Sequence, residues 1–250
     1  MELLELSHLG QNPYPGRGIL MGLDQDGLCG VMAYFIMGRS PNSKNRVFVP
    51  RGAGIATQAA DSARVTDPSL ILYTPVDKVG DTTIVTNGDQ TDTIRAALGR
   101  GGTFEEALRT RTFEPDAPNY TPRISGVMTA EGGALSYKLS ILKSGGGDPR
   151  SAERFFWEYP QPLAGQGRLL HTYLGDGSPA LPSFEGEPRA VALRGGLDDI
   201  AAALWESLSE DNRVSLFVRT VRLGDGREDT RIINRYRQKE EAPSWQANWN

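Results

Sequence analysis

The sequence predicts an α+β protein in which many short strands and a few helices pack in layers. Its 29 glycines and 16 prolines are spread along the chain and divide it into short elements. Most segments between them are apolar runs of strand length, and only four carry helix signals. Strands, a helix pair, more strands and another helix follow one another, an order typical of layered α+β proteins. We expect one domain at residues 1–238 and a polar tail at 239–250.

The first two strands are predicted at Arg17–Leu23 and Leu28–Met37, and the Asp26-Gly27 pair between them is a hairpin signal. The second run is almost entirely apolar, as expected for a strand covered on both faces. Gly132-Gly133 predicts another hairpin between the strands on either side of it. The remaining strands are expected at Arg46–Val49, Leu70–Tyr73, Thr82–Thr86, Ile124–Thr129, Ala134–Leu142, Arg168–Leu174, Ala190–Leu193, Val214–Val221 and Thr230–Tyr236.

The helix pair is predicted in the middle of the chain. Asp92 is expected to cap a helix over Thr93–Leu98. Thr103 and Glu106 have the spacing of a capping box, which predicts a second helix from Phe104 to about Arg111.

Two more helices are predicted towards the C-terminus. One covers Ser151–Tyr159 and would end at Pro160, and the other covers Leu197–Ser209. The second has Asp198 and Asp199 in its first turn, where acidic side chains complement the helix dipole. Its apolar stripe consists of Leu197, Ile200, Ala201, Leu204 and Leu208.

The composition excludes several classes of function. Cys29 is the only cysteine and the two histidines, His8 and His171, are far apart, so no metal centre of Cys or His is expected within one chain. A net charge of -4 argues against nucleic-acid binding. No apolar run approaches the roughly 20 residues of a membrane helix. The first residues lack the features of a signal peptide, so we predict a cytoplasmic protein.

A basic cluster follows the second strand. Arg39, Lys44 and Arg46 lie within Gly38–Arg46 among four small polar side chains. Arginine forks and a lysine charge suit a phosphate or a carboxylate. A solvated loop is the alternative interpretation.

A second polar cluster, Asn87, Asp89, Gln90 and Asp92, lies between a strand and a helix start, where free backbone N–H groups also point. A turn with an N-cap explains Asn87 and Asp92 but not Asp89 and Gln90.

A third cluster lies in Phe113–Ile124, where three prolines fix an extended loop that leads Thr121 and Arg123 into a strand. Glu114 and Asp116 in this loop are potential acid–base groups. A rigid connector is the alternative interpretation.

In this order, the clusters resemble the archaeal-type IMP cyclohydrolase family. The resemblance covers residues 12 to 145 and rests on Asn12-Pro13-Tyr14-Pro15-Gly16-Arg17-Gly18, Ala33-Tyr34, Arg39-Ser40, Asn45-Arg46, Leu72-Tyr73, Asn87-Gly88, Thr91-Asp92, Thr121-Pro122-Arg123-Ile124 and Gly126. It implies a four-layer αββα sandwich similar to the N-terminal-nucleophile hydrolases. Because the chain starts Met1-Glu2-Leu3, we expect no N-terminal nucleophile.

The resemblance implies an IMP cyclohydrolase of purine biosynthesis, which closes the ring of 5-formamidoimidazole-4-carboxamide ribotide with loss of water. No metal or other cofactor is implied, and the expected partners are this purine ribotide and further copies of the chain. Two alternatives are an amide-processing or cyclising enzyme acting on another ribotide, and a non-catalytic purine-nucleotide-binding protein.

The resemblance also implies roles for single residues. The implied catalytic residues are Arg39, Tyr73 and Glu114, with Glu114 as proton acceptor and Asp116 as its substitute. The implied substrate-binding residues are Arg17, Lys44, Arg46, Asn87, Asp89, Gln90, Asp92 and Arg123.

One position departs from the family, which has Asn-Gly-Ser-His-Thr-Asp where this chain has Asn87 to Asp92. Gln90 replaces the histidine, and an amide can form hydrogen bonds but cannot take up a proton near neutral pH. If the side chain at this position only binds the substrate, the cyclohydrolase activity is retained. If this side chain has to transfer a proton, the protein has another function.

Overall fold

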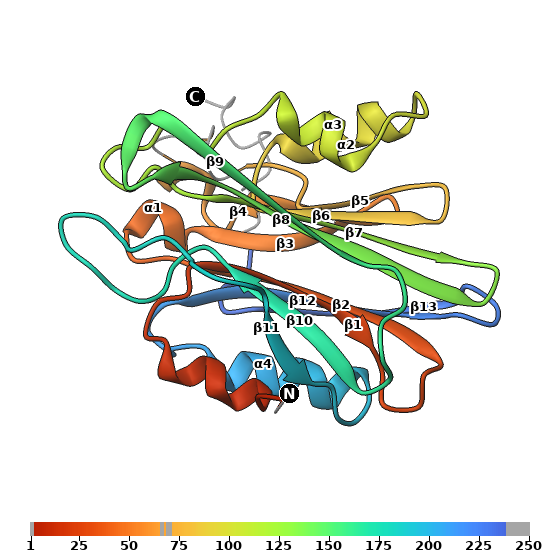
Figure 1. Cartoon of the computed structure of the whole chain (residues 1–250). Coiled ribbons are helices and arrows are strands. Elements are labelled where there is room, and N and C mark those ends of the chain that lie inside the picture. The colour runs from red at the N-terminus through yellow and green to blue at the C-terminus, as the bar shows by residue number, and fades with distance from the viewer. Residues whose placement is uncertain (1–2, 66–67, 69–71, 239–250) are drawn as a thin grey trace, which may run out of the picture.

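The computed structural model describes residues 3–65, 68 and 72–238. It contains two antiparallel sheets and few helices, which confirms the predicted α+β class (Figure 1). Sheet A has the strand order β11-β10-β1-β2-β12-β13, with β1 (Arg17–Leu23), β2 (Cys29–Met37), β10 (Gln166–His171), β11 (Arg189–Ala192), β12 (Arg213–Arg222) and β13 (Glu228–Asn234). Sheet B has the order β3-β4-β5-β6-β7-β8-β9, with β3 (Arg46–Arg51), β4 (Gly54–Ala59), β5 (Val76–Val79), β6 (Thr82–Thr86), β7 (Arg123–Glu131), β8 (Ala134–Gly145) and β9 (Asp148–Tyr159).

The two sheets face each other, and helices cover their outer faces (Figure 1). The 3₁₀ helix η1 (Leu6–Gln11) and α4 (Leu197–Ser207) lie against sheet A, whereas α2 (Gln90–Leu98) and α3 (Phe104–Arg109) lie against sheet B. Side chains alternate along the strands as a two-residue period requires. In β1, Ile19 and Met21 enter the core between the sheets, whereas Leu20 packs on the side of α4.

The core between sheet A and α4 provides a test of the packing. Leu204 is fully buried on α4. Leu204→Ala is expected to lower the free energy of unfolding by about 2–5 kcal/mol, because it removes buried methyl groups and leaves a cavity. Urea denaturation measures the change. Glu206→Ala, at an exposed position of the same helix, is the control and is expected to change stability by less than about 0.5 kcal/mol. Equal effects of the two substitutions would contradict the assigned packing.

The predicted helix over Ser151–Tyr159 is wrong, because this segment belongs to β9 and pairs antiparallel with β8. The reason lies just before it. Gly146 and Gly147 both have positive φ, at 61° and 80°, and form a two-residue turn that directs the chain back along β8. Two consecutive positive φ angles are the requirement of a type I′ hairpin. Aromatic side chains in the segment favour the strand as well.

Two further differences concern α2 and the segment Leu70–Tyr73. Helix α2 begins at Gln90 with Asp89 in the N-cap position, so the prediction that Asp92 caps this helix is wrong, and Asp92 lies in the first turn. In the predicted strand Leu70–Tyr73, the first two residues lie outside the described residues, and the last two are not in a strand. The backbone of Tyr73 instead forms hydrogen bonds with Thr57 of β4.

Three predicted features are confirmed, namely the hairpin between β1 and β2, the hairpin at Gly132-Gly133 and the capping box of α3. The sequence analysis did not predict α1 (Pro41–Lys44), η1, η2 (Ser62–Arg64), β4 and β5. The tail at 239–250 lies outside the described residues. Within residues 3–238, as far as they are described, no helix is long and apolar enough to cross a membrane.

A side chain joins the two sheets along one side of the sandwich. The amide of Asn234, at the end of β13, accepts a hydrogen bond from Phe48 N at 2.8 Å and donates one to Phe48 O at 2.9 Å. Asn234 thereby pairs with the backbone of β3 as a neighbouring strand would.

Candidate active site

The three polar clusters predicted from the sequence meet at one end of the sandwich. β1 begins at this end and β2 finishes there, since Arg17 pairs with Ile36. In sheet B, β6 ends and β7 begins at the same level, since Thr86 pairs with Ser125. The loop before β7 and the short helix before β3 therefore reach the same region from different parts of the chain.

Helix α1 positions Arg46. Ser40 and Ser43 form a reciprocal capping box that starts this short helix, and Pro41 occupies its first turn. The Arg46 guanidinium donates from Nε to Ser43 O at 2.8 Å and from Nη2 to Met37 O at 3.2 Å. Its side chain is fully buried, and Nη1 has no hydrogen-bond partner among the described residues. A buried charged donor without an acceptor is rare and indicates a place for a ligand oxygen.

Arg17 approaches the same region from the first residue of β1. Its Nε is buried and also has no hydrogen-bond partner in the described part of the chain. Burial lowers the pKa of Arg17, but Glu114 and the hydroxyl groups of Tyr173 and Tyr73 outweigh this effect and raise the pKa above its ordinary value. The guanidinium group is therefore held charged.

The turn before β1 requires a glycine. Gly16 has a φ of 77°, and a Cβ atom there would lie 2.3 Å from Oγ1 of Thr172. The glycine of the Gly16-Arg17-Gly18 motif thus allows the chain to pass close to Thr172 and to enter β1.

Glu114 is the buried carboxylate of the site. Burial raises its pKa, although the positive charges of Arg17 and Arg123 oppose the shift. A carboxylate with a raised pKa is a better proton acceptor than an ordinary one, because its conjugate acid is weaker. The structure therefore brings together a buried carboxylate and two arginines, Arg17 and Arg46, each with an N–H that has no partner among the residues the structure describes.

A pair of tyrosines completes this group. The hydroxyl oxygens of Tyr34 and Tyr73 lie 2.7 Å apart and share a hydrogen bond. Burial raises the pKa of Tyr34 well above its ordinary value, so that its hydroxyl keeps its proton. The predicted site included Tyr73 but not Tyr34. Tyr34 lies in an apolar strand, and only its place in the Ala33-Tyr34 motif marked it.

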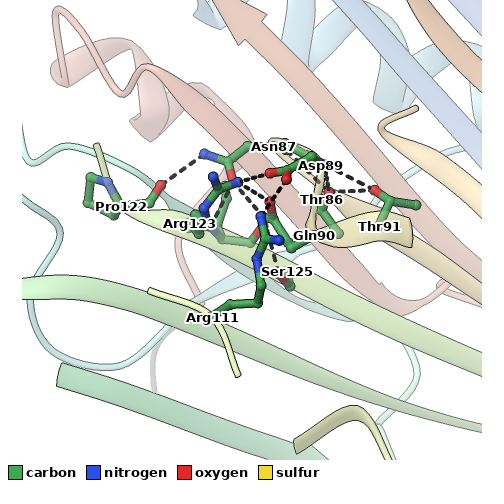
Figure 2. Close-up of polar contacts among 11 residues, drawn as sticks. Thr86, Asn87, Asp89, Gln90, Thr91, Arg111, Pro122, Arg123 and Ser125 are labelled. Atoms are coloured by element: carbon green, nitrogen blue, oxygen red, sulfur yellow. Dashed lines mark hydrogen bonds and ion pairs between the residues drawn. The ribbon is translucent and has the colours of Figure 1, made fainter. Parts of the chain in front are cut away.

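The second cluster is a closed hydrogen-bond network (Figure 2). The Gln90 amide donates from Nε2 to Asn87 Oδ1 at 3.0 Å, and its Oε1 accepts from Arg123 Nη1 at 2.7 Å. Asn87 in turn pairs with the chain before and within β7, through Pro122 O at 2.9 Å and Ile124 N at 2.9 Å. Both ends of the Gln90 amide are thus bound inside the protein, and its polar atoms orient Asn87 and Arg123.

Asp89 closes this network towards the surface. It accepts hydrogen bonds from Arg111 Nη2 at 2.5 Å and from Arg123 Nη1 at 2.6 Å (Figure 2). Burial opposes ionisation, but the two arginines lower the pKa of Asp89 below its ordinary value. Arg111 was not among the predicted site residues. Its hydrogen bond to Asp89 keeps the Asp89 carboxylate in place against Arg123.

Gly88 explains why these groups can converge. A Cβ atom at this position would lie 2.6 Å from Arg123 Nη1, 2.7 Å from Gln90 Oε1 and 3.4 Å from Glu114 Oε1. The three polar atoms therefore surround the backbone of Gly88, and a larger residue would displace the arginine or the amide. This close approach connects the network with Glu114.

Three other predicted site residues are exposed or half-buried. Asp92 is exposed on α2. Arg39 lies over the ring of Tyr14 at 5.1 Å and pairs with Asp176 at 2.5 Å. Lys44 lines a surface pocket together with Arg64 and Arg237.

Tyr14 and Tyr173 are further aromatic residues at the site that were not predicted as functional. Their rings are stacked, with centroids 6.0 Å apart. Within the described part of the chain, no group of three or more His, Cys, Asp and Glu side chains could hold a metal ion.

Comparison with known proteins identifies the family. A family model described as IMP cyclohydrolase-like protein matches residues 14–226. An IMP cyclohydrolase of Methanosphaera stadtmanae is 35% identical over 124 residues, which are 48% of this chain and 59% of that protein. One of Methanopyrus kandleri is 30% identical over 163 residues, which are 64% and 75%.

An IMP cyclohydrolase of Halobacterium salinarum is 32% identical over 126 residues, which are 48% of this chain and 60% of that protein. The matched stretch thus spans about three fifths of the Methanosphaera and Halobacterium proteins. The family match extends over most of this chain, and it confirms the family indicated by the sequence motifs. The chain belongs to the IMP cyclohydrolase-like protein family.

Proposed function

We propose that the protein is an IMP cyclohydrolase, which converts 5-formamidoimidazole-4-carboxamide ribotide to IMP and water. One observation carries this proposal: a buried carboxylate, Glu114, lies with a hydrogen-bonded tyrosine pair and with two arginines, each of which has a buried N–H without a partner in the described part of the chain. Ring closure needs an acceptor for an amide proton, a donor for the formyl oxygen and an anchor for the phosphate. The family and the three relatives support the same reaction.

In the proposed ring closure, the carboxamide nitrogen attacks the formyl carbon and a C–N bond forms. Glu114 takes a proton from this nitrogen, and Tyr73 gives a proton to the formyl oxygen. The C–O bond then breaks. The proton on Glu114 joins the departing hydroxyl group to form water, and the proton of the formamido nitrogen returns to the Tyr73 oxygen. Both side chains end in their starting protonation states.

The remaining residues bind and orient. Arg17 and Arg46 direct their free N–H groups to oxygens of the ribotide, where charge-assisted hydrogen bonds are strong. Asn87, Asp89, Gln90 and Arg123 hold one another in place and shape the wall beside Glu114. In this role Gln90 needs no proton, so its replacement of histidine is compatible with activity.

The decisive experiment is incubation of the purified protein with the formylated ribotide while IMP formation is followed by absorbance. We expect turnover. A folded protein that forms no IMP would contradict the proposal. Binding of IMP in calorimetry without turnover would then favour a nucleotide-binding protein, and turnover of a different ribotide would favour a related cyclising enzyme.

Tyr73→Phe is expected to lower kcat roughly 10- to 100-fold with little change in KM, because the hydroxyl acts on the developing oxyanion and not on the bound ground state. Steady-state kinetics separate the two constants. Tyr159→Phe is the matched control, since Tyr159 ends β9 and stacks on Tyr137. A mainly raised KM in Tyr73→Phe would assign the hydroxyl to substrate binding instead.

We also propose that the sandwich is a relative of the N-terminal-nucleophile hydrolase fold. The support is the pair of facing antiparallel sheets with helices on both outer faces. Homo-oligomer formation and a cytoplasmic location stay predictions. Light scattering of the purified protein tests the first.

A further inference from the structure

The loop that carries Glu114 is closed by a backbone hydrogen bond. Glu114 N donates to Thr121 O at 2.9 Å, so the residues between them form a compact loop. Asp116 accepts hydrogen bonds from other residues of this loop. Its backbone oxygen accepts from Tyr120 N at 3.1 Å, and its Oδ1 accepts from Thr121 N at 2.7 Å. Thr121 therefore fixes the position of the Glu114 backbone.

The hydroxyl of Thr121 forms two further hydrogen bonds, and their directions are determined. Oγ1 lies 2.5 Å from Asp116 Oδ2 and 2.6 Å from the hydroxyl oxygen of Tyr173. A threonine hydroxyl has one proton, which it donates to the carboxylate. It must therefore accept a hydrogen bond from Tyr173. The series of hydrogen bonds runs from the Tyr173 O–H through the Thr121 hydroxyl to the Asp116 carboxylate.

This chain of hydrogen bonds spans the two sheets. Thr121 comes just before β7 of sheet B, whereas Tyr173 follows β10 of sheet A. Both side chains are buried. The same loop makes a second contact with the segment after β10, since Asn119 Oδ1 accepts from Leu181 N at 3.1 Å.

The direction of these hydrogen bonds also affects Arg17. Since the Tyr173 proton points to Thr121, the lone pairs of the Tyr173 oxygen remain available to interact with a positive charge. Tyr173 is among the groups that raise the pKa of Arg17. Burial raises the pKa of Tyr173 itself to about 12, so the phenol keeps the proton that it donates.

We propose that Thr121, joined to Tyr173 and Asp116, is a positioning residue that holds Glu114 at the correct distance from the groups of sheet A. This inference rests on the proposed role of Glu114 as proton acceptor. Thr121 does not touch the substrate. It acts through the Glu114 backbone, and Tyr173 connects it to the strand end beside Arg17.

Asp116 has a second effect in this arrangement. The charged groups that face Glu114 are Arg17 from β1, Arg123 from β7 and Arg46 from β3, together with Asp116 from its own loop. The three arginines favour ionised Glu114, whereas the negative charge of Asp116 favours protonated Glu114. Loss of the Asp116 charge is therefore expected to lower the pKa of Glu114.

The test compares Thr121→Val, which removes the hydroxyl at equal size, with Thr121→Ser, which keeps it. We expect kcat to fall roughly 10- to 100-fold in Thr121→Val with a small change in KM, and to stay within about three-fold of wild type in Thr121→Ser. Wild-type kcat in a folded Thr121→Val protein, or equal losses in both variants, would overturn the proposal.

Two further variants separate positioning from chemistry. Asp116→Asn is expected to keep more turnover than Glu114→Gln and to shift the acid limb of the kcat/KM profile to lower pH. An unshifted limb, or loss of turnover to the level of Glu114→Gln, would overturn the inference. Tyr173→Phe combined with Thr121→Val should lower kcat no further than Thr121→Val alone, since Thr121→Val already removes the hydrogen bond between Thr121 and Tyr173. If the losses of kcat in the two single variants add up in the double variant, the proposed coupling of Thr121 and Tyr173 is overturned.

The outcomes distinguish this inference from the proposed function. If wild-type protein forms no IMP, the proposed function fails regardless of these variants. If wild-type protein is active and the Thr121 variants behave alike, only the positioning role fails.

Discussion

Glu114→Gln is expected to lower kcat by roughly 10²- to 10⁴-fold while KM changes little. The amide has nearly the shape of the carboxylate but cannot accept the proton of the attacking nitrogen, and positioned proton transfer contributes a factor of this size. Stopped assays with high enzyme concentration measure the residual rate. Glu131→Gln is the matched control, because Glu131 is exposed at the end of β7. Unchanged kcat in folded Glu114→Gln would exclude Glu114 as the base.

The pH profile gives a second test of the same role. A base acts in its ionised form, so activity is present above the pKa of Glu114 and is lost as the pH falls through it. Since burial raises this pKa, the acid limb of kcat/KM should lie above the value of about 4.3 for an ordinary glutamate. In Glu114→Gln the limb should disappear. Persistence of the same limb in that variant would assign it to another group.

Arg46→Ala is expected to raise KM roughly 100-fold, with a smaller effect on kcat. The side chain offers a buried N–H that none of the described residues accepts from. Loss of a charge-assisted hydrogen bond to a phosphate weakens the binding of ground state and transition state alike. Initial rates over a wide range of ribotide concentration measure KM, and calorimetry with IMP gives the matching loss of affinity.

Two variants control this experiment. Arg46→Lys keeps the charge but not the fork, so it should recover part of the affinity. Arg100→Ala removes an exposed arginine just after α2 and should leave KM unchanged. Arg46→Ala also removes the hydrogen bonds to Ser43 O and Met37 O, so thermal unfolding must show that the variant is folded. A lower kcat at normal KM would place Arg46 at the formyl group instead.

Local patterns in the sequence were sufficient for most elements of the fold. The Asp-Gly and Gly-Gly turns, the capping box of α3 and the apolar stripe of α4 all act over a few residues, and the structure has each of them. The failure at Ser151–Tyr159 has a physical reason. Its aromatic residues already favour a strand, and the positive φ angles of the two preceding glycines together with the pairing with β8 establish one.

The site was predictable to the extent that its motifs were continuous in the sequence. Glu114, Arg123 and Gln90 lie in such motifs, and the structure places their polar atoms around Gly88. The partner of Tyr73 was not predictable, because Tyr34 lies on the opposite sheet and meets it only when the sheets pack. The role of Thr121 likewise depends on Tyr173, which no local pattern connects with it.

The pairing of Asn234 with Phe48 has a consequence for self-association. On the open side of β3, Phe48 already has both backbone groups bound to the Asn234 amide, and Pro50, two residues further along the same edge, has no N–H to donate. A foreign strand therefore finds almost no free donor there. Ordered aggregation of the native protein by strand addition is therefore expected to begin elsewhere. The other outer strand of sheet B is β9, and substitutions that improve solubility are best placed on that edge.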